Sequence, residues 1–406
     1  MKIILATFGS FGDIYPFLSI GKILKDAGHD VALISNPFFR DRVIQHGIGF
    51  HPAGSAEDYK IVTAPVSFSA NPFRAKKEKI AASVRLLEYI FMKPVMETYN
   101  AVSSLSANGA FVFYHNFAYG ARLACEKHGI RGLAVSLSPY WLNEFAKPEN
   151  ARAAALRRKA RFLSSFVDAR VFLEPFNIIR ARVGLPPLEQ TGSAWMFREG
   201  SVSLFPEWLA PYRLEDGMQH VFLGFPGYAG AGRHLSDNVS KFLKNNNSPV
   251  VFTPGTSAHD TQRFFRAVTE ALDILKLPGI FLSNDRPAKE LPGHIICSDF
   301  EPLEALLPGC PLLVHHGSIG TMSAALRAGI PQIIAFQGGE RRDNARAVQR
   351  LGAGTALGWS GVSGRKLARH IQKLTASADV KARLSDISAK VSGNDFAEKL
   401  LGVLKE

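Results

Sequence analysis

The feature that most constrains the fold is a regular alternation between short apolar runs and longer segments of helical period. Residues 2–8 (KIILATF) and 30–36 (DVALISN) are apolar runs of strand length, and an amphipathic segment that closes on Gly28 separates them. The same order recurs over residues 109–138 and again over residues 249–377. Short strands that alternate with helices predict parallel sheets with helices on both faces. We therefore expect an α/β protein.

The alternation is interrupted within the first half of the chain. Residues 55–92 and 143–182 are helical in pattern, basic and rich in Phe, and a stretch near residue 228 is rich in Gly and Pro. A length of 406 residues agrees with two domains. The sequence thus predicts two doubly wound Rossmann-like domains with the following division: an N-terminal domain over 1–223, a linker over 224–232, a C-terminal domain over 233–385, and a last helix over 386–406 that packs back on the N-terminal domain.

The net charge of +13 favours anionic partners. Residues 152–166 (RAAALRRKARFLSSF) combine Arg and Lys with apolar residues at helical spacing. Such a segment is either a solvated helix face or a contact for anionic lipid headgroups, and the sequence leaves both open. No nucleic-acid-binding motif is present, so we expect no nucleic-acid partner.

Membrane-spanning segments and disulfides are not expected. No apolar run reaches the ~18 residues of a transmembrane helix, and the first apolar run ends in a glycine-rich turn rather than a signal-peptide cleavage site. Cys125, Cys297 and Cys310 lie far apart, without the spacing of a metal site or a disulfide framework. We expect a reduced, cytoplasmic protein, with peripheral contact at the cytoplasmic membrane as the alternative that the basic segment suggests.

Residues 313–321 (LVHHGSIGT) carry the strongest chemical signal. The pattern predicts a strand that delivers two histidines, two glycines and two hydroxyl groups to the start of a helix. A helix N-terminus offers free N–H groups and the positive end of the helix dipole, and both favour a phosphate group. We interpret this segment as a diphosphate-binding turn rather than as an ordinary strand–turn–helix connection.

Several motifs occur in the order typical of one family. Residues 315–321, followed by ALRAGIPQ at 325–332 and DNA at 343–345, resemble the signature of nucleotide-sugar-dependent glycosyltransferases of family 1. Residues 9–17 (GSFGDIYPF) match the N-terminal motif of the same family. Further agreements lie at 201–211, 220–226, 250–257 and 299–308. Within the family the likeness is greatest to the rhamnosyltransferases of rhamnolipid biosynthesis. The resemblance implies the GT-B fold, in which two Rossmann-like domains face each other across a cleft.

The resemblance also implies which residues bind the nucleotide-sugar donor. One histidine of the pair His315 and His316 would contact the diphosphate, and the motif does not decide which one. Phe300 would lie against the nucleobase, or would be a core residue at a strand end. Asn344 would lie near the donor, or would cap the helix that follows it. The implied donor-binding residues are Thr256, Phe300, His315, His316, Gly317, Ser318, Gly320, Thr321, Glu340 and Arg341.

The chain departs from the family pattern at two places. Relatives often carry an Asp-Gln pair that reaches the sugar hydroxyls, whereas this chain has Glu340 and Arg341, which leaves the sugar open. Many relatives carry a Glu on the ribose hydroxyls, whereas this chain has Ser323, so we expect a deoxyribose donor such as a dTDP-sugar. No Asp-x-Asp pair occurs. Because a metal-bridged diphosphate normally needs such carboxylates, we expect no metal ion and no other cofactor.

Glycosyl transfer to an alcohol needs a base for the acceptor hydroxyl and stabilisation of the departing diphosphate. Asp13 matches the position at which several members of the family carry the base. A base on the face opposite the leaving group implies inversion at the anomeric carbon. The alternative role of Asp13 is to cap a helix that begins near Tyr15. His115, at the end of another expected strand, is a rival base or an orienting residue.

The acceptor is expected to be hydrophobic, because exposed aromatic side chains often line binding pockets. The candidates for contact with it are Phe8, Phe11, Phe68, His115, Tyr140 and Trp141. The resemblance implies that L-rhamnose passes from dTDP-rhamnose to a 3-hydroxyacyl lipid. Three alternatives stay open: transfer from UDP-glucose to a small hydrophobic natural product, a sugar-nucleotide 2-epimerase, and a non-catalytic partner protein. A dinucleotide dehydrogenase is disfavoured, because Gly9 and Gly12 lack the spacing of the usual fingerprint.

Overall fold

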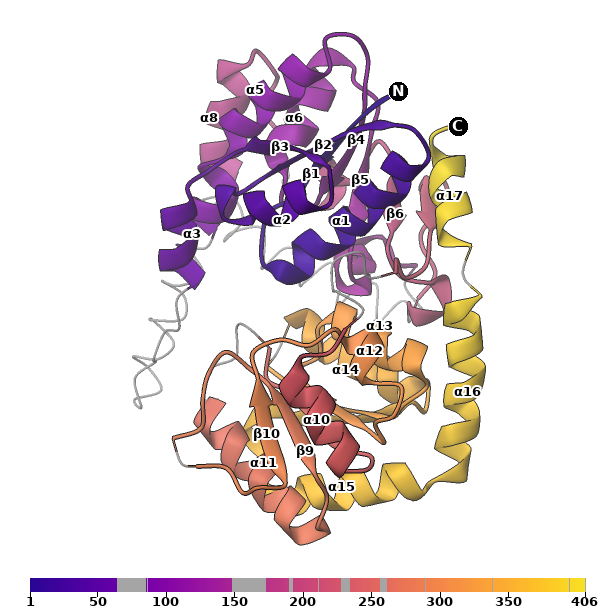
Figure 1. Ribbon diagram of the computed structural model, residues 1–406. Coiled ribbons are helices and arrows are strands. Elements are labelled where there is room, and N and C mark those ends of the chain that lie inside the picture. Colours follow the sequence, from indigo (N-terminus) through magenta and orange to yellow (C-terminus); the bar gives the residue numbers. More distant parts are fainter. Residues whose placement is uncertain are drawn as a thin grey trace. The chain divides into compact units, whose positions relative to one another are not determined.

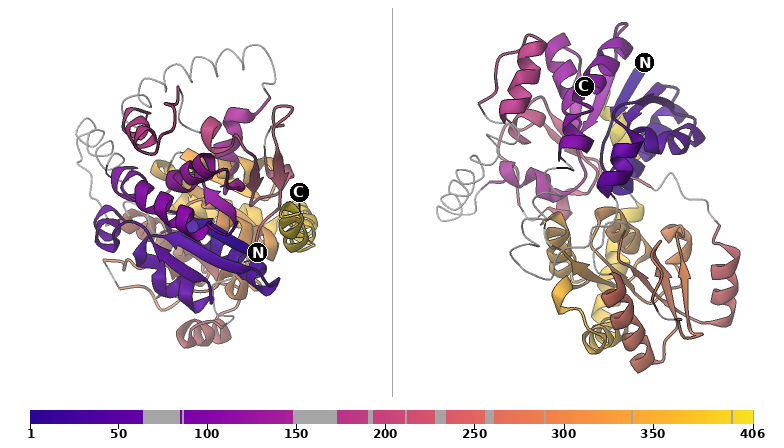
Figure 2. Two further views of the ribbon diagram at one scale, coloured as in Figure 1. Left: turned by 90° about the horizontal axis from the view of Figure 1, so that it is seen from above. Right: turned by 90° about the vertical axis from the view of Figure 1, so that its left-hand side faces the viewer.

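The computed structural model of the chain describes residues 1–63, 85, 87–147, 173–189, 193–210, 212–227, 234–255, 261–288, 290–337, 339–393 and 395–405. Two compact units are present (Figures 1 and 2). The first unit holds the described residues up to 227 and those from 395 onward, and the second holds those from 234 to 393. The expected start of the last element at residue 386 is wrong. That residue lies inside helix α16 (Ala378–Ser392) of the second unit, and only α17 (Phe396–Val403) groups with the first.

Among the described residues, the first unit is built on a parallel sheet of seven strands in the order β3-β2-β1-β4-β5-β6-β7. The chain moves outward from β1 through β2 and β3 and then returns to the other side of β1, so the strand order reverses between β1 and β4. The expected doubly wound topology is confirmed for this unit. The strands are β1 (Lys2–Ala6), β2 (Asp30–Ser35), β3 (Gly49–Pro52), β4 (Phe111–His115), β5 (Gly132–Ser136), β6 (Ser201–Ser203) and β7 (His220–Phe222).

Burial explains which of these strands the sequence reveals. Residues Ile3, Ile4 and Leu5 of β1 are fully buried between paired neighbours on both sides, and strands buried on both faces read as continuous apolar runs. Strands β6 and β7 were not expected, because three residues are too few to show a period.

The helices of this unit are α1 (Phe11–Asp26), α2 (Arg40–Gln45), α3 (Ala56–Thr63), α5 (Val95–Leu105), α6 (Tyr119–His128), α8 (Glu174–Arg182), α9 (Ser193–Met196) and α17, with 3₁₀ turns at Pro37–Phe39, Pro139–Phe145 and Glu207–Leu209 and a π-helical turn at Leu87–Met92.

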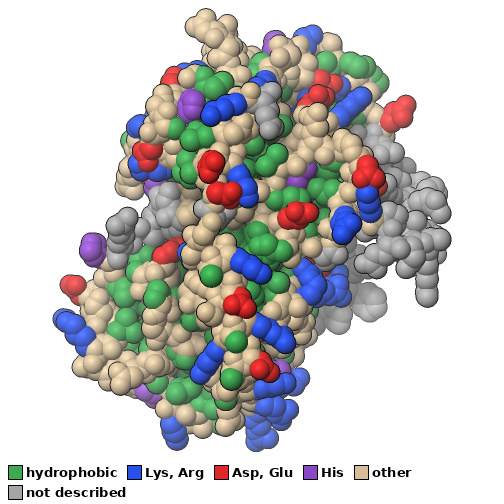
Figure 3. Space-filling view, turned by 90° about the vertical axis from the view of Figure 1, so that its right-hand side faces the viewer, with side chains coloured by type: hydrophobic (Ala, Val, Ile, Leu, Met, Phe, Trp, Pro, Cys, Tyr) green, Lys and Arg blue, Asp and Glu red, His purple; other side chains and the backbone are tan. Residues whose placement is uncertain are grey.

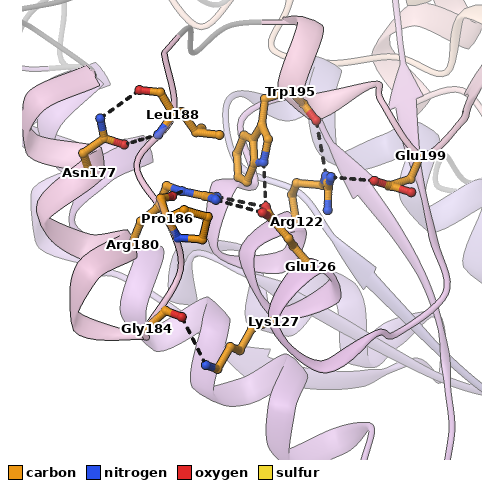
Figure 4. Close-up of polar contacts among 10 residues, drawn as sticks. All are labelled: Arg122, Glu126, Lys127, Asn177, Arg180, Gly184, Pro186, Leu188, Trp195 and Glu199. Carbon is orange, nitrogen blue, oxygen red and sulfur yellow. Dashed lines mark hydrogen bonds and ion pairs between the residues drawn. The ribbon is translucent and has the colours of Figure 1, made fainter.

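A buried polar network joins α6 to α8 and α9 (Figure 4). Arg180 donates hydrogen bonds of 2.8 and 2.9 Å to the two carboxylate oxygens of Glu126, and the indole of Trp195 donates to the same group at 2.7 Å. The Arg180 hydrogen bonds are the main reason that the pKa of Glu126 lies below its usual value. Arg122 donates to the Trp195 carbonyl and to Glu199. Because Arg180, Arg122 and Trp195 are almost fully buried and all belong to this network, it fastens α8 and α9 to the helix that follows β4.

The second unit is also a parallel doubly wound sheet, as expected. In the part of it that the structure describes, six strands follow the order β10-β9-β8-β11-β12-β13, so the order reverses between β8 and β11. The strands are β8 (Val250–Thr253), β9 (Gly279–Leu282), β10 (Ile295–Ser298), β11 (Leu313–His315), β12 (Gln332–Phe336) and β13 (Gly354–Gly358). The helices are α10 (Asp237–Asn245), α11 (Thr261–Leu275), α12 (Leu303–Leu306), α13 (Ile319–Ala328), α14 (Gly339–Arg350), α15 (Gly364–Ala376) and α16, with a 3₁₀ turn at Trp359–Gly361.

Alternate residues of the central strands in the second unit enter different cores. Val250 and Phe252 belong to one cluster, which α11 and α15 cover, whereas Val251 belongs to another, which α10, α12 and α13 cover. This arrangement follows from the two-residue period of a strand. The sheet is thus covered on both faces, and the carboxyl ends of its strands are left for ligands. In such sheets ligands bind beyond those ends, at the point where the strand order reverses.

The charge excess does not form one continuous field on the face drawn in Figure 3, where Lys and Arg side chains are interspersed with carboxylates. No helix among the described residues is long and apolar enough to cross a membrane. The basic segment 152–166, on which the lipid-contact alternative rests, lies outside the described residues.

Candidate active site

The turn after β1 differs from the expectation in the point at which the helix begins. Helix α1 starts at Phe11 with Ser10 as its N-cap, so Asp13 is the third residue of the helix. The Asp13 carboxylate accepts hydrogen bonds from the Ser10 N–H at 2.6 Å and the Ser10 hydroxyl at 3.0 Å. A third-position carboxylate that accepts from the N-cap N–H is one half of a capping box. The expectation that the helix begins near Tyr15 is therefore wrong, while the capping role of Asp13 is present.

Gly9 makes room for this carboxylate. The φ angle of Gly9 is +132°, and a Cβ atom built on it would lie 2.3 Å from Asp13 Oδ2. A side chain at Gly9 would therefore displace the acid, and its backbone angle also favours glycine. Gly12 is exposed, and the nearest atom to a Cβ built there is Ser10 Oγ at 3.6 Å. One glycine of the motif makes room for the acid, whereas a Cβ atom at the other would make only an ordinary contact.

Strand β4 brings His115 to the same end of the sheet, because β4 pairs with β1 and ends at His115. The distance from His115 Nε2 to Asp13 Oδ1 is 3.8 Å, which is beyond hydrogen-bond length. Burial lowers the pKa of His115 to about 3, so its ring is neutral at pH 7. Burial also raises the pKa of Asp13 to about 6, although 27% of its side chain remains exposed. Asp13 is thus a reachable carboxylate whose basicity is increased by desolvation.

Two buried polar atoms at the end of β4 have no hydrogen-bond partner. They are His115 Nδ1 and Asn116 Oδ1, on residues that are 1% and 5% exposed. The rings of Phe17 and Phe117 lie edge-on to the His115 ring and hold it in place. Buried polar atoms without a partner are infrequent in native proteins. Asn116 was not predicted as a candidate site residue, because a single Asn after a strand is typical of a turn.

The structure removes two residues from the expected acceptor-binding set. Phe8 is 2% exposed and His115 is 1% exposed, so both are parts of the core and neither offers a surface to an acceptor. Phe8 ends the first apolar run, and that run continues into the core up to the turn. Phe68 lies outside the described residues.

The remaining aromatic candidates belong to two groups. Trp141 is half-buried and packs edge-on against Tyr140 and Phe117, with ring centroids 5.1 and 5.0 Å apart. Tyr140 is 40% exposed. Phe11 is half-buried and stacks on Tyr15 at the start of α1. These aromatic side chains remain as candidates for contact with a hydrophobic acceptor.

In the second unit, the structure separates the roles of the two histidines after β11. His315 is fully buried, with Nε2 2.9 Å from Gln332 Oε1 and Nδ1 accepting the Gly317 N–H at 3.2 Å. Burial lowers the pKa of His315 to about 4. Both ring nitrogens are engaged inside the fold, so His315 has none left for a ligand. His315 joins β11 to β12 and is removed from the donor-binding candidates. The partner Gln332 was not predicted, because it lies in an otherwise apolar strand.

His316 has the opposite character. His316 is half-buried, and its Nδ1 atom has no hydrogen-bond partner. The ring lies against Gly255, at which a Cβ atom would come within 2.5 Å of the imidazole. Burial is the main cause that lowers the pKa of His316 well below its usual value, and the charge of Arg341 is the next. His316 is therefore a neutral imidazole that lies near a cationic side chain.

Helix α13 begins directly after the histidines, as predicted. Ser318 is the N-cap, and the first turn contains no acidic residue. The Ser318 hydroxyl donates to Thr321 Oγ1 at 2.8 Å, and Gly320 is exposed. The first N–H groups of a helix lack intrahelical partners and attract anions. The hydroxyl of Ser323, at the expected ribose position, donates to the Gly320 carbonyl at 2.8 Å.

Asn344 does not cap a helix. Helix α14 already begins at Gly339, and Asn344 lies within it, 1% exposed, with Nδ2 donating to the Gly317 carbonyl at 2.9 Å. A Cβ atom on Gly317 would lie 2.7 Å from Ile334 and 3.1 Å from the Arg341 carbonyl oxygen. Helix α14 is therefore fastened directly against the Gly317 turn, and glycine is required there for this close packing.

Phe300 is 55% exposed, so the alternative interpretation of it as a core residue is wrong. The next residue, Glu301, is 2% exposed and anchors the loop. Its carboxylate accepts hydrogen bonds from the Ser236 N–H at 2.9 Å, the Ser236 hydroxyl at 2.5 Å and the Ser298 hydroxyl at 2.7 Å. Glu301, which sequence reasoning missed, holds the loop in which Phe300 is exposed.

The remaining candidates divide between described and undescribed residues. Glu340 and Arg341 are half-buried on α14. Thr256 lies outside the described residues. In the described part of the chain, no group of three or more His, Cys, Asp or Glu side chains is arranged to hold a metal ion.

Comparison with known proteins identifies the class. Residues 3–146 match the model of the glycosyltransferase family 28 N-terminal domain, and residues 280–398 match that of the erythromycin biosynthesis protein CIII-like C-terminal domain. An uncharacterised glycosyltransferase of Mycobacterium tuberculosis (strain H37Rv) is 24% identical over 97% of this chain and 95% of its own length.

Solved structures agree with this assignment at the level of the fold. The glycosyltransferase VinC, in complex with dTDP, gives a TM-score of 0.73 at 20% identity and covers 100% of this chain and 99% of its own. The spinosyn rhamnosyltransferase SpnG gives a TM-score of 0.66 at 16% identity and covers 100% of both chains. The chain is a glycosyltransferase with the GT-B fold, and its two matched segments are similar to a family 28 N-terminal domain and to an erythromycin CIII-like C-terminal domain.

Proposed function

We propose that this glycosyltransferase is inverting and independent of metal, and that it moves a sugar to the hydroxyl of a lipid-like acceptor with Asp13 as general base. One observation carries the proposal: the point of strand-order reversal in the first unit holds a partly exposed carboxylate whose pKa burial raises to about 6. A base with a pKa near the working pH is effective in proton abstraction. The corresponding point of the second unit holds a helix N-terminus without an acidic first turn, which suits a leaving diphosphate.

In the proposed reaction, the acceptor oxygen attacks the anomeric carbon while Asp13 takes the hydroxyl proton. The bond from the anomeric carbon to the donor phosphate oxygen breaks, and its electron pair leaves with the nucleoside diphosphate. A single displacement of this kind inverts the anomeric carbon. His115 stays neutral, because burial lowers its pKa to about 3, and so it does not take the proton from Asp13. The proton on Asp13 then passes to water after the product has left.

The nucleotide-sugar donor is proposed to bind to the second unit. His316 is proposed as the histidine that contacts the diphosphate, since both nitrogens of His315 are used inside the fold. The N–H groups of the first turn of α13 and the hydroxyl of Thr321 would complete that contact. The exposed ring of Phe300 would stack on the nucleobase, and base–aromatic stacking is worth about 1–3 kcal/mol.

The finer identity of the substrates is also part of this proposal. Ser323 in place of a ribose-binding carboxylate favours a deoxyribose donor, so dTDP-rhamnose is the proposed donor. The neighbours SpnG, a rhamnosyltransferase by name, and VinC, solved with dTDP, are consistent with this choice. The half-buried aromatic side chains Phe11 and Trp141 and the exposed Tyr140 favour a hydrophobic acceptor, for which a 3-hydroxyacyl-3-hydroxy fatty acid is proposed.

The test is a panel of UDP- and dTDP-sugars offered to the purified protein with hydroxy fatty acid dimers and small aromatic alcohols. We expect sugar transfer from dTDP-rhamnose to the lipid-like acceptor, measured by mass spectrometry of the product. Faster transfer from UDP-glucose to an aromatic alcohol would replace this assignment by transfer to a small natural product. Release of an altered sugar nucleotide without any acceptor would indicate a 2-epimerase, and no turnover with any pair would indicate a non-catalytic partner.

Removal of metal ions tests the proposed charge stabilisation separately. Turnover after dialysis against EDTA should stay within about twofold of the untreated rate, because the diphosphate is met by N–H groups and side chains. A matched sample restored with Mg²⁺ is the control. Loss of turnover in EDTA with recovery in Mg²⁺ would contradict the metal-independent mechanism.

A further inference from the structure

We infer that Arg341 binds the diphosphate of the donor and neutralises the charge of the leaving group, instead of contacting the sugar hydroxyls. This inference deepens the proposed function and rests on it. The family resemblance implies a sugar-contacting amide at this position, whereas this chain has a guanidinium. The contacts of α14 in this structure favour a role at the phosphate turn.

The first argument is the packing of Arg341 against the turn. A Cβ atom on Gly317 would lie 3.1 Å from the Arg341 carbonyl oxygen and 3.3 Å from Arg341 Cβ, so this residue lies directly over Gly317. The hydrogen bond of 2.9 Å from Asn344 Nδ2 to the Gly317 carbonyl fastens the same helix there. The start of the Arg341 side chain is thereby fixed beside the turn that leads into α13.

The second argument is the charge around His316. Burial is the main cause of the low pKa of His316, and the charge of Arg341 contributes to it. His316 Nδ1 is a buried atom without a partner. Burial also lowers the pKa of Arg341 itself, and the neighbouring Glu340 carboxylate partly offsets this, so the guanidinium lies in a partly desolvated environment in which an ion pair is strengthened.

The third argument is that the turn itself carries no full positive charge. The first turn of α13 offers N–H groups and hydroxyls and has no acidic residue. A diphosphate leaving group therefore meets N–H groups, an imidazole and hydroxyls, but only partial positive charge from these. A guanidinium supplies a full positive charge and pairs well with phosphate oxygens.

The experiment compares the binding of dTDP, dTMP and thymidine to the purified full-length wild type and to Arg341→Gln, which restores the amide implied by the resemblance. Calorimetry should show that the substitution weakens dTDP binding about tenfold or more, since hydrogen bonds to charged groups are worth about 1.5–3 kcal/mol. Thymidine binding should stay within about twofold. Arg341→Lys should restore part of the loss, and Arg342→Gln, an exposed neighbour on the same helix, is the matched control for net charge.

Equal dTDP affinity of Arg341→Gln and the wild type would overturn the inference, and so would a parallel loss of thymidine affinity, which indicates a structural effect. Kinetics give a second readout: a phosphate role lowers kcat with every donor that is a dTDP-sugar, whereas a sugar role lowers it for one sugar. Failure of the proposed function is distinguishable, because then the wild type itself transfers no sugar. If the wild type transfers sugar and Arg341→Gln binds dTDP normally, only this inference fails.

Discussion

The turns at the two points of strand-order reversal share the pattern Gly-Ser-x-Gly but differ in the charge of the residue that follows it. Residues 9–13 read GSFGD after β1, and residues 317–321 read GSIGT after β11. In both turns the first glycine has a positive φ angle, +132° at Gly9 and +98° at Gly317, and the serine is the N-cap of a helix. The third helical residue differs: it is Asp13 in α1 and Thr321 in α13.

This one difference decides which charge each turn can accept. Asp13 places its own carboxylate at the N-terminus of α1, where it accepts the Ser10 N–H, so that end of the helix is not available to an anion. Thr321 brings a neutral hydroxyl, so the N-terminus of α13 keeps its attraction for an external anion. The comparison teaches that a glycine-rich turn after a strand is not by itself a phosphate site, because its chemistry depends on the third residue of the helix.

The largest expected effect comes from removing the charge at Asp13. Asp13→Asn should lower kcat by about 10³-fold, since general base catalysis contributes about 10²–10⁴-fold. Its amide oxygen can still accept the Ser10 N–H, so dTDP affinity, which depends on the other turn, should stay within about twofold. Steady-state kinetics and calorimetry measure the two quantities. A rate near that of the wild type would show that another group takes the proton.

The converse substitution makes the second turn resemble the first. Thr321→Asp should weaken dTDP binding by about 100-fold, because a carboxylate beside a diphosphate costs several kcal/mol. The Asn side chain has nearly the same shape as Asp but no charge, so Thr321→Asn is the matched control. Calorimetric titration with dTDP gives both affinities. Equal losses in the two variants would mean that shape rather than charge governs this turn.

The two histidines after β11 should separate stability from binding. His316→Ala should weaken dTDP binding about tenfold, in line with a hydrogen bond to a charged group. His315→Ala leaves the buried Oε1 atom of Gln332 without its partner, which should lower the free energy of unfolding by about 1–3 kcal/mol. Thermal unfolding followed by circular dichroism measures the second effect. The assignment would be reversed by a His315→Ala protein of normal stability that does not bind dTDP.

A smaller effect concerns the stability cost of burying the Asp13 carboxylate. The pKa of Asp13 is raised from 3.8 to about 6 in the folded state, so the folded state binds the proton more tightly than the unfolded state does. Stability therefore falls as the pH rises from about 4 to about 6 and stays lower above that. Asp13→Asn lacks this titration and should be more stable than the wild type at pH 7.5 by at most about 3 kcal/mol. Urea titrations at pH 4 and pH 7.5 compare the two proteins, and a stability difference that is the same at both pH values would contradict the raised pKa.

Much of the fold could be predicted because it rests on local patterns. The strands beside each reversal point are buried on both faces, and their apolar runs are visible without knowledge of the partners. Strands β6 and β7 were missed, because three residues carry no period, and the start of α1 was placed too late, because Pro16 reads as a helix start although it lies inside α1. Helix α16 was also missed as a separate element, since it was merged with the last helix.

The sequence by itself determined the two doubly wound sheets and the class of enzyme, and it pointed to the two turns at which the chemistry is proposed, because periodicity and motif spacing are local properties. Only the tertiary structure decided which histidine is free, since the answer depends on the contact of His315 with Gln332 on a neighbouring strand. The tertiary structure also shows that the missing side chain of Gly9 makes room for the carboxylate of Asp13, and that burial raises the pKa of this acid. Burial and hydrogen-bond partners come from residues distant in the chain, and these set the protonation state of each group.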